Sequence, residues 1–509
     1  MSKWHSFLEY LQFSLKVLFF ATLLLGIGST ISNPLLKLVD PAEPSILLLI
    51  SNLMRYGGAF TIQLFPLLVF IKVLGKHFSD SSPLMIGIFS YIIILIIVMV
   101  LERNDFPSYF YHSVLGIELK NAIVNSSSYN IQYPYQMGIF PLIIAYLITC
   151  YSYKRSRHHI RHGMFYFIDH DCWALIIALF FSVIAGIAFT FIWPWVIQLM
   201  MLLFDYIASD INNPIHLFFY GILDRLFAIS NMVDIPRNVF WLSEAGGSYI
   251  DVIGNSYYGD ASIWMATKDM IEVNVTSGSF ISGFYVINLF LIPSFLFAYY
   301  RLMGTKEQKY RYLIFILLAW LLSIFCGNPI PIEIGMLVLS PLLYLFYLLI
   351  VGFAFAACAA FEAFIGFYFD GNLLTSLPGN LLDLFSYIGN YHFYRSIWII
   401  LIIGVILGII FYFATIFYFR HFAIGLLSMQ DADEICEHVI HAMGGIDNIT
   451  AIYSTPDKIM ASFKNRDEVN LDELHELGAY LILESRDGYT IRLGNLSIMI
   501  GERIQKKLK

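Results

Sequence analysis

Long apolar stretches alternate with short polar segments over most of the chain. Each apolar stretch is close to the length of about 20 residues that a helix needs to cross a bilayer. The pattern predicts a polytopic α-helical membrane protein with about eight full spans and a broken region, or about eight to ten crossings in all. In chain order, the predicted spans are residues 13–31, 57–73, 84–101, 137–151, 173–201, 280–300, 336–360 and 396–419.

The broken region is residues 326–334, where Pro329 and Pro331 interrupt an apolar stretch. A proline removes a backbone donor and fixes φ, so this spacing predicts a helix, a break and a second helix, with Glu333 just after the break. Broken backbone at membrane depth persists only where protein buries it or where it lines a wet cavity, and an acid there is a candidate functional residue. The alternative is a surface loop with a solvated Glu333, which the flanking apolar stretches disfavour.

The composition agrees with a membrane protein. Hydrophobic residues make up 58% and charged residues 13% of the 509 residues, whereas soluble chains carry about 25% charged residues. With 30 Lys and Arg against 37 Asp and Glu, the chain has no excess of positive charge to bind nucleic acid. The five cysteines have no metal or redox spacing, and the triplet Asp169, His170 and Asp171 is disfavoured as a metal site because adjacent side chains do not converge easily on one ion. We therefore expect no metal and no cofactor, and the lipid bilayer as a partner.

Basic residues indicate the orientation in the membrane. The loop 154–162 contains four Lys and Arg residues, a pattern typical of the cytoplasmic side. After four predicted crossings, this loop implies a cytoplasmic N-terminus, and the basic cluster at 301–311 should lie on the same side. A lipid or partner patch is the alternative interpretation. Residues 13–31 are interpreted as the first membrane helix, because no small-residue cleavage pattern of a signal peptide follows them.

The composition changes after residue 431, where the sequence becomes charged. It predicts a small α+β domain of about 75 residues with a four-stranded antiparallel sheet, which is large enough to fold alone. Gly444-Gly445 would cap its first helix, and Asp487-Gly488 would form a hairpin turn. The predicted domains are a membrane region at 1–425, a linker at 426–431 and a cytoplasmic domain at 432–509. The expected elements of this last domain are helices at 432–443, 471–477 and 496–507 and strands at 449–453, 458–463, 479–484 and 489–493.

Several motifs carry a resemblance to a known family. Residues 327–334 resemble the Gly-Ile-Thr-Glu-Pro-Ile-Glu-Phe signature of enzyme IIC, the membrane permease subunit of the bacterial sugar phosphotransferase system (PTS), in its glucose superfamily. The resemblance covers nearly the whole chain, and it implies a multi-pass sugar permease of the bacterial inner membrane, with a cytoplasmic enzyme IIB-like domain and a homodimeric assembly. Residues 23–28, 218–227, 240–241, 277–285 and 339–344 are similar to further enzyme IIC signatures, and residues 444–449, 477–478 and 493–494 are similar to enzyme IIB.

The departures from the family fall on the residues of phosphoryl transfer. In enzyme IIB a cysteine takes the phosphate, and the matching position here is Thr455, whose hydroxyl is a far weaker nucleophile than a thiolate. The family's Gly-Leu-His-His appears as residues 231–234, so Val233 and Asp234 replace histidines that could shuttle a proton. The first Glu of the permease signature is Ile330, and a basic loop of the family is acidic at 169–173. Together these changes indicate that phosphoryl transfer has been lost.

Three functions remain open. The first is a permease that binds or transports a hexose or amino sugar, such as glucose or N-acetylglucosamine, without phosphorylating it. The second is a non-transporting membrane sensor or scaffold. The third is a phosphotransferase subunit that receives phosphate in trans from other PTS components. No catalytic residue is predicted, and Thr455 stands at a degenerate phosphorylation site. The predicted substrate-binding residues are Glu333, Asn328, Asn231 and Asp234.

Overall fold

The computed structural model describes residues 2–508 except 34–37, 40–44, 79–80, 103–104, 113–118, 122–129, 157–169, 269–276, 304–305, 423–431, 456, 478, 480, 486–487 and 494–495. Within these residues, six helices are long and apolar enough to cross a membrane, and a bent helix pair could form a seventh span. The prediction of a polytopic helical membrane protein is confirmed. Most of the basic loop at 154–162 lies outside the described residues. The six helices are α1 (Ser2–Ile31), α4 (Ser82–Leu101), α6 (His170–Ala208), the run from Ser282 to Leu302, α14 (Pro341–Ala360) and α16 (Tyr394–Phe417).

The bent pair is formed by α2 (Ile46–Gln63) and α3 (Phe65–His77), whose axes differ by 53°. Pro66 in the first turn of α3 explains the break, because proline is tolerated where a helix starts but not in its interior. Gly58 allows α2 to pack closely on α1, since a Cβ there would lie 2.6 Å from the carbonyl oxygen of Ala21. The missing side chain of Gly58 therefore lets the two helices approach closely.

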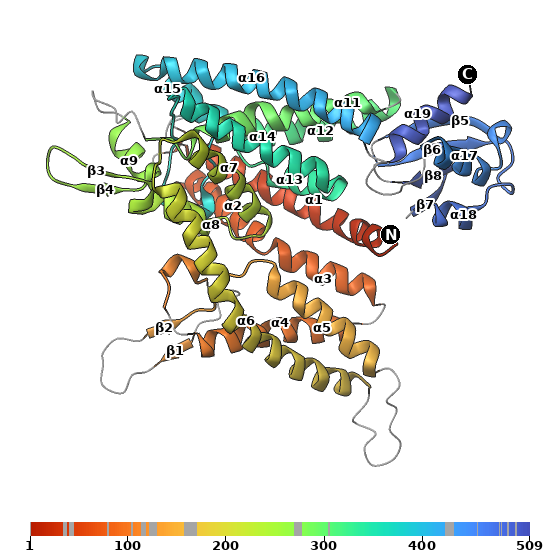
Figure 1. Cartoon of the computed structure of the whole chain (residues 1–509), viewed down its shortest axis with the longest axis horizontal. Coiled ribbons are helices and arrows are strands. Elements are labelled where there is room, and N and C mark those ends of the chain that lie inside the picture. Colours follow the sequence, from red (N-terminus) through yellow and green to blue (C-terminus); the bar gives the residue numbers. More distant parts are fainter. Residues whose placement is uncertain are drawn as a thin grey trace, which may run out of the picture.

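Three helices form a lobe that diverges from the other membrane helices, at the bottom of Figure 1. They are α4, α5 (Phe140–Ser156) and α6, and they pack against one another along their lengths. Gly186 of α6 meets Ile97 of α4, where a Cβ would approach the Ile97 Cβ to 2.6 Å. The long helix α6 continues from this lobe to the upper group of helices, where its last turns contact α7 (Pro214–Ile229) and α8 (Asp234–Leu242).

The predicted break around residues 326–334 is present, with a second break that the sequence analysis did not anticipate. Helix α12 (Lys306–Cys326) ends before Gly327, which has φ +62°, and α13 (Ile330–Leu339) follows. The expected continuous span 336–360 is interrupted at Ser340, which is extended and whose hydroxyl accepts the N–H of Leu343 at 3.3 Å to cap α14. Pro341 lacks the donor that would join the two helices, so α13 is a separate short helix.

Two polar segments of the membrane region contain buried structure. Residues 231–260 include α8 and a hairpin of β3 (Ser248–Ile250) and β4 (Ser256–Tyr258), followed by α9 (Asp260–Thr267). Residues 370–391, predicted as an exposed loop, instead bury Asp383 at 2% exposure and contain η5 (Leu373–Thr375) and α15 (Leu381–Tyr387). Gly379 allows this burial, because a Cβ there would lie 2.5 Å from the carbonyl carbon of Phe284.

The run from Ser282 to Leu302 contains a π-helical turn. It comprises α10 (Ser282–Val286), the π-helix η4 (Ile287–Leu291) and α11 (Ile292–Leu302). Single π-helical turns inside α-helices often mark functional positions, because the extra residue redirects a side chain. Here the redirected region carries Asn288, which is completely buried.

The C-terminal domain has the predicted four-stranded antiparallel sheet, with strands in the order β5-β6-β8-β7. The helices α17 (Ala432–Ala442) and α19 (Ser497–Lys507) share the domain's own apolar core with buried residues of the sheet, and Ile498 of α19 packs instead with the core of the membrane region. Gly444 and Gly445 have positive φ and end α17, as expected. Its elements are α17 (Ala432–Ala442), β5 (Ile449–Ser454), β6 (Ile459–Phe463), α18 (Leu471–Glu476), β7 (Leu481–Ser485), β8 (Gly488–Arg492) and α19 (Ser497–Lys507).

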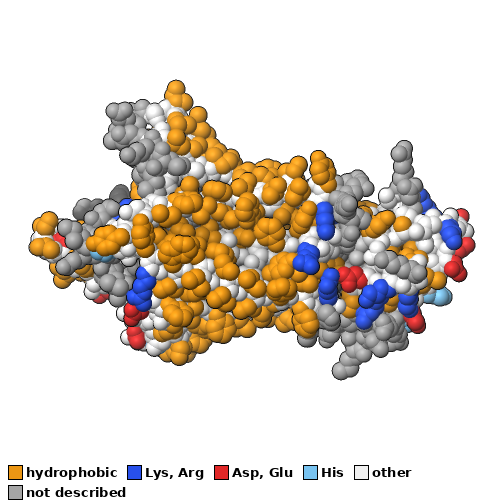
Figure 2. Space-filling model, turned by 90° about the horizontal axis from the view of Figure 1, so that it is seen from above, with side chains coloured by type: hydrophobic (Ala, Val, Ile, Leu, Met, Phe, Trp, Pro, Cys, Tyr) orange, Lys and Arg blue, Asp and Glu red, His pale blue; other side chains and the backbone are white. Residues whose placement is uncertain are grey.

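The outer surface of the membrane region is apolar. Figure 2 shows hydrophobic side chains covering this region, with Lys and Arg gathered at its junction with the C-terminal domain. Phe180, Phe191 and Trp195 on α6 are between 62% and 73% exposed. Apolar surface on this scale fits contact with lipid, because soluble monomers rarely expose large contiguous apolar patches.

Candidate functional site

A buried network of two carboxylates and two guanidinium groups lies at the centre of the membrane region. Asp224 and Arg225 are neighbours on α7, Arg237 is on α8, and Glu333 is on α13. Arg225 pairs with Asp224 and lies 3.4 Å from Glu333, while the Nε of Arg237 donates to Asp224 at 3.1 Å. None of the four side chains is more than 9% exposed. The charges balance, and balance is what makes the burial of ionised groups tolerable.

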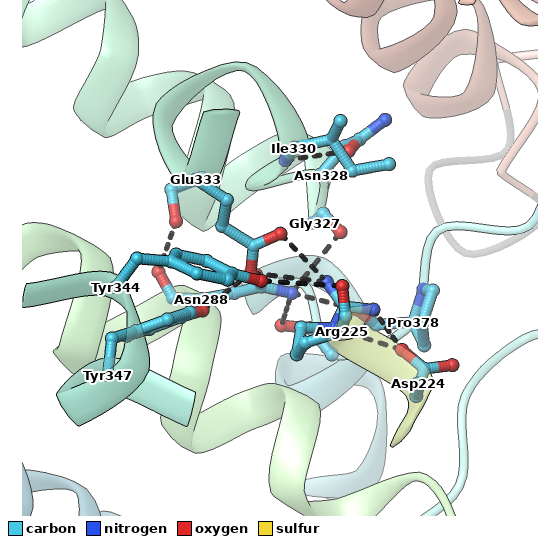
Figure 3. A network of polar contacts seen from close by, with 12 residues as sticks. Asp224, Arg225, Asn288, Gly327, Asn328, Ile330, Glu333, Tyr344, Tyr347 and Pro378 are labelled. Carbon is cyan, nitrogen blue, oxygen red and sulfur yellow. Dashed lines mark hydrogen bonds and ion pairs between the residues drawn. The ribbon is translucent and has the colours of Figure 1, made fainter. Parts of the chain in front are cut away.

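Glu333 is fully enclosed by this network and by an aromatic side chain of α14. The hydroxyl of Tyr347 donates to Glu333 Oε1 at 2.5 Å, and Arg225 approaches both carboxylate oxygens at 3.4 and 3.5 Å (Figure 3). Glu333 is 0% exposed and does not line either of the two cavities described below. The predicted contact between Glu333 and a sugar remains a prediction, and in this conformation the carboxylate binds Arg225.

Asn288 ties the central break to the segment that follows α14. Its Nδ2 donates to the carbonyl oxygens of Gly327 at 3.2 Å, Pro378 at 2.9 Å and Gly379 at 3.3 Å. The hydroxyl of Ser323 in turn donates to the Asn288 carbonyl oxygen at 2.7 Å. Asn288 therefore satisfies backbone carbonyls that the broken helix leaves free, which is a requirement for irregular backbone at membrane depth. Sequence reasoning missed this residue, because a lone Asn in an apolar span carries no local signal.

A central cavity of about 100 Å³ lies beside the ion-pair network. Three of the four predicted substrate-binding residues line it: Asn231, Asp234 and Asn328. Arg225 and Arg237 line it as well, so the network supplies one wall of the cavity. The structure thus brings together residues from α7, α8 and the start of α13, which are up to about a hundred residues apart in sequence.

Local geometry fixes the polar residues of the central cavity. Asn231 has φ +60°, a conformation that Asn tolerates better than most residues, and its Nδ2 donates to the Gln63 carbonyl oxygen at 3.1 Å. Asp234 is the first residue of α8, where the helix dipole favours a carboxylate. The side chain of Asn328 accepts the N–H of Ile330 at 3.2 Å at the turn into α13.

His112 also lines the central cavity, and sequence reasoning missed it. It follows η2 (Ser108–Phe110) in the long polar segment between α4 and α5. Nothing in the local sequence distinguishes it from the Tyr and Asn residues around it. Burial lowers the pKa of His112, and the negative charge of Asp234 acts in the opposite direction. An imidazole therefore lines the same cavity as Val233 and Asp234, although it comes from a different element.

A second, larger cavity of about 280 Å³ lies between α1, α2 and the segment that carries α15. Arg55 pairs with Asp370 at its wall and donates to Thr375 at 2.9 Å. Asp383 also lines it, and burial raises the pKa of this carboxyl from its ordinary value of 3.8 to about 7. None of the predicted substrate-binding residues lines this cavity, so the central cavity is the stronger candidate site.

Asp260 is a further buried carboxyl group outside the spanning helices. It accepts the backbone N–H groups of Gly278 at 2.6 Å and Phe280 at 2.9 Å, in the segment that resembles a family signature. Burial raises its pKa from 3.8 to about 7, although these N–H groups oppose the shift by stabilising the carboxylate. The arrangement fixes the backbone just before α10, and Asp260 lines neither of the two cavities described here.

Thr455 lies directly after β5 and is 2% exposed. Its hydroxyl donates to Asp457 Oδ1 at 2.8 Å and accepts the N–H of Lys458 at 3.2 Å, so it closes a tight turn between β5 and β6. Cys436 is completely buried in α17. The predicted loss of phosphoryl transfer is not tested by this geometry and stays a prediction.

The fold and the buried polar centre define a multi-pass helical membrane protein with a small α+β domain. Comparison with known proteins adds a family relationship. The chain is 25% identical over 383 residues to the PTS system glucosamine-specific EIICBA component of Bacillus subtilis (strain 168), covering 72% of this chain and 57% of that protein. It is also 25% identical to the PTS system glucoside-specific EIICBA component of Staphylococcus carnosus (strain TM300), covering 73% of this chain and 53% of that protein.

The chain is thus a distant relative of PTS components of the glucose superfamily. It spans a little over half the length of these two relatives. No protein-family model matches the chain.

Proposed function

We propose that the protein is a sugar permease related to the PTS glucose superfamily, and that it moves a hexose or amino sugar without phosphorylating it. The observation that carries the proposal is the central cavity, where Asn231, Asp234 and Asn328 meet beside Arg225. Amide, carboxylate and guanidinium groups provide both donors and acceptors for sugar hydroxyls. Glu333 holds Arg225 in place, and it would contact the sugar itself only after the pair separates.

The geometry around Thr455 in the C-terminal domain supports the proposal that the sugar is not phosphorylated. Thr455 stands where a phosphate-accepting cysteine is expected, and both its hydrogen-bond functions are used within the turn. The domain lies at the same end of the membrane helices as the start of α1 in Figure 1, as expected if both are cytoplasmic. We propose the bacterial inner membrane as the location and a homodimer as the assembly, as the resemblance implies.

The first test is binding. The detergent-purified protein is heated with glucose, glucosamine, N-acetylglucosamine or a glucoside, and a sugar that binds raises the apparent melting temperature. Asn231→Gly keeps the left-handed backbone but removes the side chain, and we expect it to weaken binding about tenfold through the loss of about 1–1.5 kcal/mol. The matched control is Asn255→Gly, an exposed residue in the β3–β4 hairpin, which should leave the affinity unchanged.

The second test is transport. Protein reconstituted in liposomes should exchange labelled sugar across the membrane without any phosphate donor. Formation of sugar phosphate after addition of PTS components would instead favour a subunit phosphorylated in trans. Absence of binding and exchange with all four sugars would rule out the permease proposal.

A second candidate function is a membrane sensor, because the C-terminal domain contacts the end of the last span. Helix α19 packs against η7 (Tyr418–Phe422), and Arg420 lies 3.7 Å from Glu502. This ion pair is about half exposed and therefore contributes little to stability. Ile498 of α19 also packs with the core of the membrane region, so a ligand-driven change in that region would reach the domain directly. Sugar-dependent protease cleavage near residue 425, without sugar exchange, would favour this function.

A further inference from the structure

Two titratable side chains reach the central cavity from different parts of the chain. His112 belongs to the segment between α4 and α5, whereas Asp234 begins α8. The segment that carries His112 is anchored, because the His112 N–H donates to the Pro134 carbonyl oxygen at 3.1 Å and the Gln136 N–H donates to that of Phe110 at 2.7 Å. The imidazole is therefore a built part of the cavity wall.

The electrostatic environments of His112 and Asp234 bring their pKa values together. Burial raises the pKa of Asp234 above its ordinary value of 3.8, and Arg237 and His112 oppose this shift. Burial lowers the pKa of His112 below its ordinary value of 6.5, and Asp234 opposes that shift. Each group acts electrostatically on the other, so the two side chains facing this cavity can share one proton as a coupled pair.

The other charged groups near the pair are already neutralised by partners. Among the described residues lining the central cavity, Arg225 and Arg237 are the remaining charged side chains, and both bind Asp224. Arg225 also pairs with Glu333. Gln63, at the end of α2, interacts with Asp234 as a neutral hydrogen-bond partner. His112 and Asp234 are therefore the candidate proton-binding groups of this cavity.

We propose that His112 and Asp234 form a proton site that couples sugar transport to the movement of one proton. The proposal rests on the proposed permease function and supplies the driving force that phosphorylation provides in the PTS. The proton adds to the pair from water on one side of the membrane and leaves to water on the other side, and no bond of the sugar is made or broken. Protonation removes the negative charge of the pair when the sugar enters the cavity.

The experiment compares exchange with accumulation in liposomes that contain the full chain. Labelled glucose, glucosamine or methyl α-glucoside is offered first at equal pH and then with the interior one pH unit more alkaline. One proton per sugar should allow accumulation up to about tenfold, since one pH unit equals about 1.4 kcal/mol. In His112→Gln and Asp234→Asn, the ratio of gradient-driven uptake to exchange should fall at least about fivefold relative to the wild type. The control is His392→Gln, at an exposed histidine in η6 (Tyr391–Phe393), which should keep the wild-type ratio.

Each outcome decides the proposal. Exchange that does not respond to the pH gradient would overturn the proton site and leave the permease function standing. Accumulation that persists in both variants would overturn the assignment to these two residues. Absence of exchange for all three sugars would overturn the permease function and the proton site together. Because a variant could simply misfold, Asp234→Glu, which retains a carboxylate, should restore the coupling that Asp234→Asn loses.

Discussion

Two acidic residues near the centre of the membrane region are close to the same polar cluster but have opposite surroundings. Glu333 is completely buried, accepts a hydrogen bond from Tyr347 at 2.5 Å and pairs with Arg225. Asp234 lines the central cavity, and the group that titrates beside it is His112. The first carboxylate has a fixed cationic partner, whereas the second lies at a cavity wall that a histidine shares.

This difference separates an acid that holds an ion pair from an acid that we propose to bind a proton. A buried ion pair costs a large desolvation penalty, and removing one partner leaves a charge without compensation. An acid at a cavity wall has no such fixed partner, so its loss should cost little stability but alter function. The resemblance to the PTS family favours Glu333 as the functional acid, whereas the geometry of the cavity favours Asp234.

The largest expected effect is the loss of stability in Glu333→Gln. The amide still accepts from Tyr347, but Arg225 and Arg237 would then face Asp224 alone, so we expect a loss of about 3–5 kcal/mol. The measurement is the apparent melting temperature in detergent, with the exposed Glu244→Gln as the matched control. A variant as stable as the wild type would mean that Glu333 is not a structural acid.

Arg237→Lys should have the next largest effect. Arg237 donates to Asp224 at 3.1 Å and lies over the Trp241 ring with 4.8 Å between its Cζ and the ring centroid. Lysine keeps the charge but loses the planar fork and the stacking, so we expect a loss of about 1–3 kcal/mol in the same melting experiment. Arg395→Lys, at an exposed arginine of α16, is the control, and equal effects in the two variants would contradict the importance of the network.

The pH dependence of stability tests two buried acids outside the spanning helices, Asp260 and Asp383. Burial raises the pKa values of Asp260 and Asp383 from 3.8 to about 7. A raised folded-state pKa contributes stability that is present below 3.8 and is lost as the pH rises through about 7. Stability should therefore increase from pH 8 to pH 6, by about 1 kcal/mol for each group.

The apparent melting temperature at pH 6, 7 and 8 checks this expectation. Asp383→Asn should remove about half of the gain between pH 8 and pH 6, because the amide does not titrate. A melting temperature that falls between pH 8 and pH 6 would show that other groups dominate.

The smallest expected effect on stability is that of Asp234→Asn. Because burial raises the pKa of Asp234, its ionised form is less stable than in water, so the amide should be neutral or slightly stabilising above pH 7. We expect a change of less than about 1 kcal/mol, with the exposed Asp210→Asn as the control. A loss as large as that in Glu333→Gln would remove the distinction between the two acids.

In the C-terminal domain, local sequence patterns are enough to predict the helices and strands. All three helices and four strands occur where the alternation of apolar and polar residues predicts them, within about two residues at each end. In the membrane region, Pro329 and Pro331 correctly mark a break, since proline restricts the backbone whatever surrounds it. The length of each apolar stretch likewise predicts the spanning helices, because a helix must be about 20 residues long to cross the bilayer.

The tertiary structure alone decided which polar residues share a cavity. Residues 370–391 look like an exposed loop in the sequence, yet Asn288 and the backbone near Gly379 draw this segment into the interior. His112 joins Asp234 only because the chain between α4 and α5 folds back over α8. Composition and periodicity report on the neighbours of a residue along the chain. The pairing of charges depends instead on contacts between distant segments, and those contacts pair Glu333 with Arg225 and bring Asp234 to the cavity wall.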